Sequence, residues 1–158
     1  MGEANGAGAV VAALTLAVGL VIAVIASVED LRTHLLRDVR TGALAAVAVA
    51  GFTLAAPLGG GWRPLPMVLG AVAFATPWLV VHLIAPAAAG FGDVKFSAAL
   101  GLHLGWLDPV LSMWAVVAGC GVFVTWAVAA RAARHEPRPF GPALVAGSVI
   151  AVGVAALG

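Results

Sequence analysis

Apolar stretches of about 20 residues recur along the whole chain, and they constrain its fold more than any other feature. A helix of that length crosses the hydrocarbon core of a bilayer. Six stretches can be delimited, at residues 8–28, 42–58, 67–85, 94–107, 109–130 and 140–157. They use most of the 158 residues and leave no room for a separate soluble domain. We therefore predict an all-α, polytopic membrane protein of about six transmembrane helices, built as one integral membrane domain over residues 1–158.

The scarcity of charge excludes several other classes of protein. Charged residues make up 9% of the chain, against roughly 25% in a soluble domain. This composition excludes a soluble enzyme, a disordered chain and a nucleic-acid binder with a basic patch. The single cysteine, Cys120, excludes a disulfide scaffold. The stretch at residues 94–107 would form a helix of only about 21 Å, which is short for a transmembrane span.

The few basic residues orient the predicted helices. Six crossings place both termini on one side of the membrane and the segments 29–41, 89–95 and 131–139 on the other. These three segments contain seven of the eight basic residues, namely Arg32, Arg37, Arg40, Lys95, Arg131, Arg134 and Arg138. Only Arg63 falls on the opposite side. Because basic loops stay in the cytoplasm, we predict that both termini face out.

Two aspartates fall at matched ends of predicted helices. Asp30 follows the first apolar stretch and Asp93 precedes the fourth, so the topology places both at the same depth on the cytoplasmic side. Two carboxylates in a partly dry site share one proton. The ionised partner can then activate a water while the protonated one hydrogen-bonds the carbonyl under attack. The alternative is that both are ordinary helix-end acids, and spacing cannot choose between Asp30 and Glu29.

The residues around Asp93 fit such a role. Gly90 and Gly92 would let the backbone turn sharply and approach another segment closely. Asp93 would then lie at a helix N-terminus, where the positive end of the helix dipole favours a carboxylate. Lys95, two residues on, would point away from Asp93 and reach the lipid headgroups.

The remaining polar residues have structural interpretations. We expect His82 and His103 to be neutral and hydrogen-bonded between helices, and His34 to be a solvated loop residue. Neither His82 nor His103 has enough candidate partners for a metal site, so we predict no metal and no cofactor. The glycines that bound residues 101–105 form a small-xxx-small pattern that favours close helix packing. Cys120 is interpreted as a packing residue.

Three segments carry a resemblance to a known family. The sequence GFGDVKF at residues 90–96 contains the GxGD signature of intramembrane aspartyl proteases. With its continuation it resembles the prepilin peptidase (type IV leader peptidase) family. The sequence SVEDLRTHLL at 27–36 resembles the first catalytic segment of that family, and this alignment favours Asp30 over Glu29. The sequence PFGP at 139–142 resembles the family's carboxy-terminal segment.

The resemblance implies a function. It implies an aspartic endopeptidase in the inner (plasma) membrane of a prokaryote, which cleaves the leader peptide of membrane-inserted, prepilin-like proteins at the cytoplasmic face. Asp30 and Asp93 would be catalytic, and Gly90, Gly92 and Lys95 would support the motif. The implied partners are the prepilin-like substrate and the lipid bilayer, without nucleic acid. Because the chain has no paired CxxC motifs, it resembles the short, peptidase-only members.

Two alternatives stay open, and one of them follows from a departure from the family. Where the family usually has Ile-Pro-Asn after the first aspartate, this chain has Leu36-Arg37-Asp38. The loop therefore lacks a proline and gains an acid, which leaves room for a pseudoenzyme that binds prepilins without cutting them. The other alternative is a small transporter or pilus assembly factor that uses Asp30 and Asp93 as a proton or cation site.

Overall fold

The chain folds into a bundle of helices. The computed structural model describes residues 2–86, 89–132 and 139–157, and within these residues it contains no strand. The elements are α1 (Gly2–Thr33), α2 (Asp38–Ala55), the 3₁₀-helix η1 (Ala56–Leu58), α3 (Pro64–Ile84), α4 (Phe91–Leu107), α5 (Pro109–Ala132) and α6 (Gly141–Leu157). The prediction of an all-α protein with six helices is confirmed.

Most of the helices have the length and composition of membrane spans. Four are long and apolar enough to cross a bilayer, over Gly6–Thr33, Asp38–Leu58, Pro64–Ile84 and Pro109–Ala130. Helices α4 and α6 have 17 residues each, or about 26 Å. Large apolar side chains such as Val10, Val72 and Val117 are exposed on the bundle, as lipid-facing residues are. In hydrocarbon a helix is favoured because it pairs its backbone N–H and C=O groups internally.

The polar segment after the first span is shorter than the sequence indicated. Helix α1 continues to Thr33 and α2 already begins at Asp38, so only residues 34–37 join them. The prediction of a long loop over 29–41 is therefore wrong. Charged side chains at a helix end can reach water while the backbone stays helical. His34 ends α1 in a left-handed conformation, with φ of 56°, and its N–H donates to the carbonyl oxygen of Asp30 over 2.8 Å.

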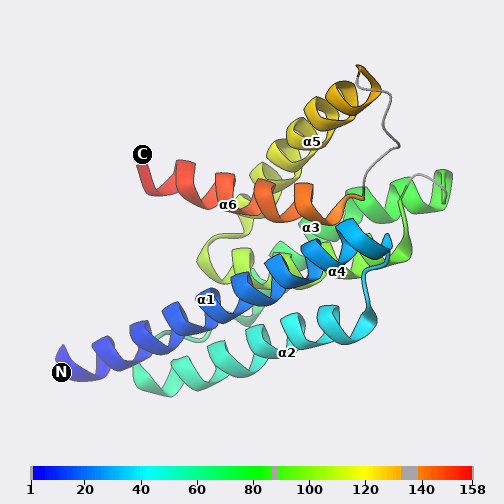
Figure 1. Ribbon diagram of the computed structural model, residues 1–158. Helices are drawn as coiled ribbons and strands as arrows, with labels where there is room; N and C mark the ends of the chain where they lie inside the picture. The colour runs from blue at the N-terminus through cyan, green and yellow to red at the C-terminus, as the bar shows by residue number, and fades with distance from the viewer. Residues whose placement is uncertain (1, 87–88, 133–138, 158) are drawn as a thin grey trace.

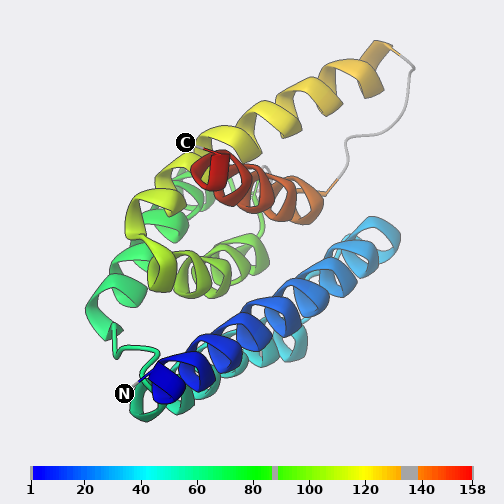
Figure 2. The ribbon, with the colours of Figure 1, turned by 90° about the vertical axis from the view of Figure 1, so that its left-hand side faces the viewer.

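Successive helices run in alternating directions. Helices α1 and α2 form an antiparallel pair, α3 and α4 form a second pair, and α5 and α6 cross the bundle beside them (Figures 1 and 2). The start of α1 and the end of α6 lie at one end of the molecule, and the ends of α1, α3 and α5 lie at the other (Figure 1). This arrangement brings the end of α1, the start of α4 and the start of α6 together.

Glycines allow α3 and α4 to approach each other closely. A Cβ atom on Gly101 would lie 2.5 Å from the carbonyl oxygen of Gly70, and one on Gly105 would collide with the backbone of Pro66. Only hydrogen atoms fit between the two backbones at these points. The prediction that residues 101–105 serve helix packing is confirmed.

His103 is a packing residue rather than a link between helices. Its side chain is buried, and its Nδ1 atom lies 3.0 Å from the carbonyl oxygen of Ala99 in the same helix. The imidazole meets the ring of Phe52 edge-on and fills the space left by the missing side chain of Gly19 on α1. The expected hydrogen bond to a neighbouring helix is therefore wrong for His103, because a bond to the preceding turn takes its place.

Exchange of Gly101 for alanine tests the contact between α3 and α4. The added methyl group would force the two helices apart, so we expect Gly101→Ala to lower the free energy of unfolding by roughly 1–3 kcal/mol. Unfolding by sodium dodecyl sulfate in mixed micelles, followed by circular dichroism, measures the change. Gly121→Ala on α5 is the control, because no atom lies within 4 Å of its added Cβ. Equal stability of Gly101→Ala and wild type would contradict the close approach.

Candidate active site

A cavity of about 1010 Å³ lies at the end of the bundle opposite the termini. Its polar part is formed by Asp30 and His34 at the end of α1 and by Asp93 at the start of α4. Its apolar part includes aromatic side chains of α3, α5 and the segment before α6, namely Trp78, Phe123 and Phe140. The fold thus brings the two aspartates singled out from the sequence to one cavity, although they are 63 residues apart.

Asp30 is a buried carboxylate held by a distant helix. Only 3% of the residue is exposed. Its Oδ2 atom accepts a hydrogen bond of 3.0 Å from the N–H of Gly141, the first residue of α6. The N-terminus of a helix presents free N–H groups and the positive end of the helix dipole, and both favour a carboxylate. A buried acid in α1 thereby obtains a partner that its own helix cannot supply.

The structure separates Asp30 from its neighbour Glu29. The Glu29 carboxylate is paired with Arg37 and Arg40, with N–O distances of 3.3 Å to each. Consecutive residues on a helix point about 100° apart. Asp30 consequently faces the cavity, whereas Glu29 faces the basic side chains of the connection and of α2. Sequence spacing could not distinguish the two acids.

Asp93 lies in the first turn of α4, ahead of the apolar stretch that begins at residue 94. Its Oδ2 atom accepts a hydrogen bond of 2.9 Å from the N–H of Gly90, and its own N–H donates to the Gly90 carbonyl over 3.1 Å. Burial raises the pKa of Asp93 to about 6, opposed by the hydrogen bond from Gly90 and assisted by the negative charge of Asp30. Asp93 therefore holds a proton far more readily than an ordinary aspartate.

The two carboxylates have matching surroundings. In each, a glycine N–H at a helix N-terminus holds the Oδ2 atom. Among the described residues, neither Oδ1 atom of Asp30 or Asp93 has a hydrogen-bond partner. Each carboxylate thus keeps one oxygen free at the cavity that both residues line. The two carboxylates are close enough for the charge of Asp30 to raise the pKa of Asp93.

The glycines before Asp93 fulfil one part of the prediction, the close approach to another segment, at Gly92. Neither Gly90 nor Gly92 has a positive φ, so the expected sharp turn that only glycine can adopt is not formed there. At Gly92 the need is for space, because a Cβ would lie 3.2 Å from the Cβ of Leu36. At Gly90 an added Cβ would have 3.6 Å to the nearest atom, an ordinary contact. Gly92 lets the start of α4 pack against the connection between α1 and α2.

The unusual Leu36-Arg37-Asp38 sequence forms an ordered connection. Arg37 has φ of −70°, close to the value that proline imposes. Asp38 accepts a hydrogen bond of 2.7 Å from the Lys95 ammonium, while Leu36 packs against the core. Leu36 and Asp38 thus tie the connection to the start of α4, while Arg37 pairs with Glu29 on α1.

Lys95 has a protein partner that the sequence did not predict. Its ammonium pairs with Asp38 and lies 5.1 Å from the centre of the Phe91 ring. The expected contact with lipid headgroups stays a prediction. His82 lies in the last turn of α3, and its Nδ1 atom is 2.9 Å from the carbonyl oxygen of Ala89 in the connection to α4. In the part of the chain that the structure describes, no three His, Cys, Asp or Glu side chains cluster as metal ligands would.

Some cavity residues were missed by sequence reasoning. Cys120 was expected to pack between helices, yet it is exposed and lines the cavity. His34 is exposed, as expected of a loop residue, but it also lines the cavity. The contact of Gly141 with Asp30 joins residues 111 positions apart, so no local pattern could indicate it. The resemblance of residues 139–142 to a family segment was the only signal.

Comparisons with known proteins identify the family. The model of the type IV leader peptidase family matches residues 17–156, and the chain therefore belongs to that family. Two curated relatives are each called "Prepilin leader peptidase/N-methyltransferase", from Burkholderia pseudomallei strains 1026b and K96243. Each is 44% identical over 73 residues, which cover 44% of this chain and 23% of the relative. The match thus spans about a quarter of those relatives. No solved structure matches the chain.

The position of Cys120 allows a direct test of the cavity. A thiol facing hydrocarbon stays protonated and unreactive, whereas a thiol in a hydrated cavity can ionise and react. We expect a water-soluble maleimide to label native Cys120 in membranes, from the side on which α1, α3 and α5 end. The matched control is a Cys120→Ser, Val117→Cys variant, since Val117 is on the same helix but outside this cavity. Equal labelling of both thiols, or of neither, would contradict a hydrated cavity.

Proposed function

We propose that the protein is an intramembrane aspartic endopeptidase that removes the leader peptide of prepilin-like proteins at the cytoplasmic face of the membrane. The observation that carries the proposal is the convergence of Asp30 and Asp93 on one cavity, each with an oxygen free of protein partners. Membership of the type IV leader peptidase family and the names of the curated relatives support the substrate class.

The raised pKa of Asp93 supports a division of roles. In the proposed mechanism Asp30 is ionised and takes a proton from a water between the two carboxylates, and the water oxygen attacks the scissile carbonyl carbon. Asp93, which holds its proton more readily, gives that proton to the carbonyl oxygen as the tetrahedral intermediate forms. Asp93 recovers the proton as the intermediate collapses, and Asp30 delivers its proton to the leaving nitrogen. No covalent intermediate is formed.

The distribution of charge supports a cytoplasmic active site. The cavity lies at the end of the bundle where α1, α3 and α5 end, and the sequence places seven of the eight basic residues in the three segments at that end. Basic loops are retained in the cytoplasm. The substrate would then present the boundary between its leader and its apolar helix to the cavity, which has both a polar and an aromatic side.

Isosteric variants test the catalytic pair. Asp30→Asn and Asp93→Asn should each lower the cleavage of a co-expressed prepilin by about 10²-fold or more, because neither amide can exchange the required proton. Glu29→Gln should stay within about twofold, since Glu29 only joins exposed ion pairs with Arg37 and Arg40. Cleavage is measured by the mobility of the substrate on gels, and circular dichroism checks the fold.

Two outcomes would overturn this proposal. Full activity of either asparagine variant would exclude the paired mechanism. Proton-driven flux in vesicles without cleavage of any prepilin would favour a transporter that uses the same two carboxylates.

The pKa of Asp93 predicts the pH dependence of cleavage. Asp93 must be protonated to assist the carbonyl, so kcat/KM should fall as the pH rises through about 6, the pKa of this group in the free enzyme. Bound substrate excludes water, which disfavours the ionised form further, so the same limb of the kcat profile should lie at higher pH. Cleavage of a prepilin peptide in detergent micelles between pH 4 and 9 measures both profiles. A kcat/KM that is constant from pH 5 to 8 would contradict the assignment.

A further inference from the structure

The N-terminus of α6 has an unusual set of hydrogen bonds. A helix begins with four N–H groups that have no partner within the helix. In α6 the N–H group of Ala143 donates to the carbonyl oxygen of Phe140 over 3.0 Å, and the N–H of Leu144 makes the first regular helical hydrogen bond to the same oxygen over 3.1 Å. Pro142 has no N–H to donate. The N–H of Gly141 donates to the carboxylate of Asp30 on α1.

Residue 141 must be small for this bond to form. A Cβ atom on Gly141 would lie 2.6 Å from Oδ2 of Asp30 and 3.4 Å from its Cβ and Cγ atoms. Any side chain at this position would push the carboxylate away from the N–H group that holds it. Gly141 does not have a positive φ, so its backbone conformation does not require glycine. Glycine is required here because of the limited space beside Asp30.

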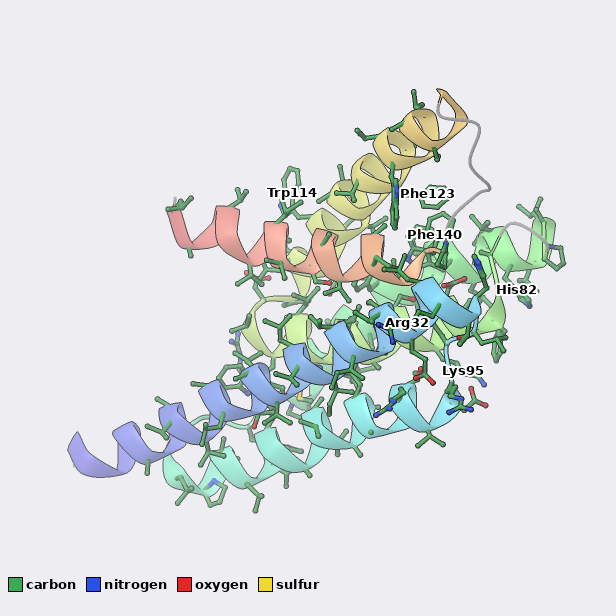
Figure 3. The ribbon with its side chains drawn as sticks, viewed as in Figure 1. Arg32, His82, Lys95, Trp114, Phe123 and Phe140 are labelled. Atoms are coloured by element: carbon green, nitrogen blue, oxygen red, sulfur yellow. The ribbon has the colours of Figure 1, made fainter. Side chains whose placement is uncertain are left out.

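Phe140 fixes the start of α6 in turn. Its ring stacks on Phe123 of α5, with the ring centres 3.6 Å apart, and meets Trp78 of α3 edge-on at 4.8 Å. Figure 3 shows Phe123 and Phe140 side by side between α5 and the start of α6. The contacts of Phe140 with α3 and α5 thereby determine where the neighbouring N–H of Gly141 lies.

We infer that residues 139–142 form a positioning element, in which Phe140 anchors the start of α6 and the Gly141 N–H fixes the orientation of the Asp30 carboxylate. The inference rests on the proposed function, since it assigns a role relative to the reacting water. With Oδ2 held by Gly141, the Oδ1 atom is the one left for that water. Gly141 is thus a positioning residue that acts through Asp30.

The choice of cap argues for this role. Most helices obtain their cap from a Ser, Thr, Asp or Asn at the residue before the first turn. In α6 that residue is Phe140, which has no side-chain acceptor, and the cap comes from a residue 111 positions away. A local cap would have stabilised α6 equally well. It would have left the orientation of Asp30 undetermined.

Other ionisable groups near Asp30 must be considered in any pH measurement. Asp93 on α4, His34 after α1 and Cys120 on α5 line the same cavity. Glu29, the neighbour of Asp30 in the chain, is paired with arginines instead. The variants Gly141→Ala and Pro142→Ala leave all of these side chains in place. A change in the acid limb, which is the fall of kcat at low pH, can therefore be assigned to Asp30.

Two substitutions at the start of α6 should move the acid limb in opposite directions. The Cβ added by Gly141→Ala pushes the ionised carboxylate of Asp30 away from its N–H donor, so kcat should fall about 10-fold or more, KM should change less than about twofold, and the acid limb should move to higher pH. Pro142→Ala adds an N–H group at the next position of α6, so the acid limb should move to lower pH. The readout is the pH profile of kcat for cleavage of a prepilin peptide by the purified full-length protein.

Gly153→Ala is the matched control on the same helix, because no atom lies within 4 Å of its added Cβ, and it should keep the wild-type profile. A folded Gly141→Ala variant with wild-type kcat and acid limb would overturn the inference. So would a Pro142→Ala limb that is unmoved or shifted upward, and this result decides the matter if Gly141→Ala does not fold. Loss of cleavage in Asp30→Asn with no effect of either α6 variant would reject the positioning role alone. Full activity of Asp30→Asn would reject the proposed function itself.

Discussion

Hydrocarbon offers no hydrogen-bond partners, so the backbone N–H and C=O groups of a chain in the membrane are satisfied best by partners within the protein. This constraint explains why the apolar stretches become helices, and it also governs the helix ends. Two carbonyl groups at the end of α4 accept hydrogen bonds from Arg63. The side chain of Asp108 accepts one from Val110 at the start of α5. The start of α6 is satisfied by Asp30.

The candidate active site uses the same kind of hydrogen bond at helix ends. The Asp30 carboxylate lies at the N-terminus of α6, and Asp93 lies in the first turn of α4. In each case a glycine N–H offsets part of the cost of burying a carboxylate. The remaining cost is visible in the pKa of Asp93, which burial raises to about 6. An arginine beside either acid would hold it ionised. Three cations near the site are instead paired with other acids, Arg37 and Arg40 with Glu29 and Lys95 with Asp38.

Much of this organisation could be read from the sequence. Six apolar stretches predicted the six helices, because the length of a membrane span is fixed by the thickness of the bilayer. The glycines at 101 and 105 indicated close packing, and the GxGD and PFGP sequences indicated the family, which the family match confirms. Helix ends were less predictable. The charges at 29–33 suggested a loop, yet α1 continues through them, since its charged side chains lie at the edge of the bundle.

The sequence by itself determined that this chain is an all-helical membrane protein of the type IV leader peptidase family, because hydropathy and short motifs are local properties. Only the tertiary structure decided which acid faces the cavity, what holds it, and that Cys120 lies there too. Neighbours such as Glu29 and Asp30 have the same local sequence and differ only in the direction in which they leave the helix. What each one meets depends on α2 and α6, so it is fixed by the packing of segments far apart in the chain.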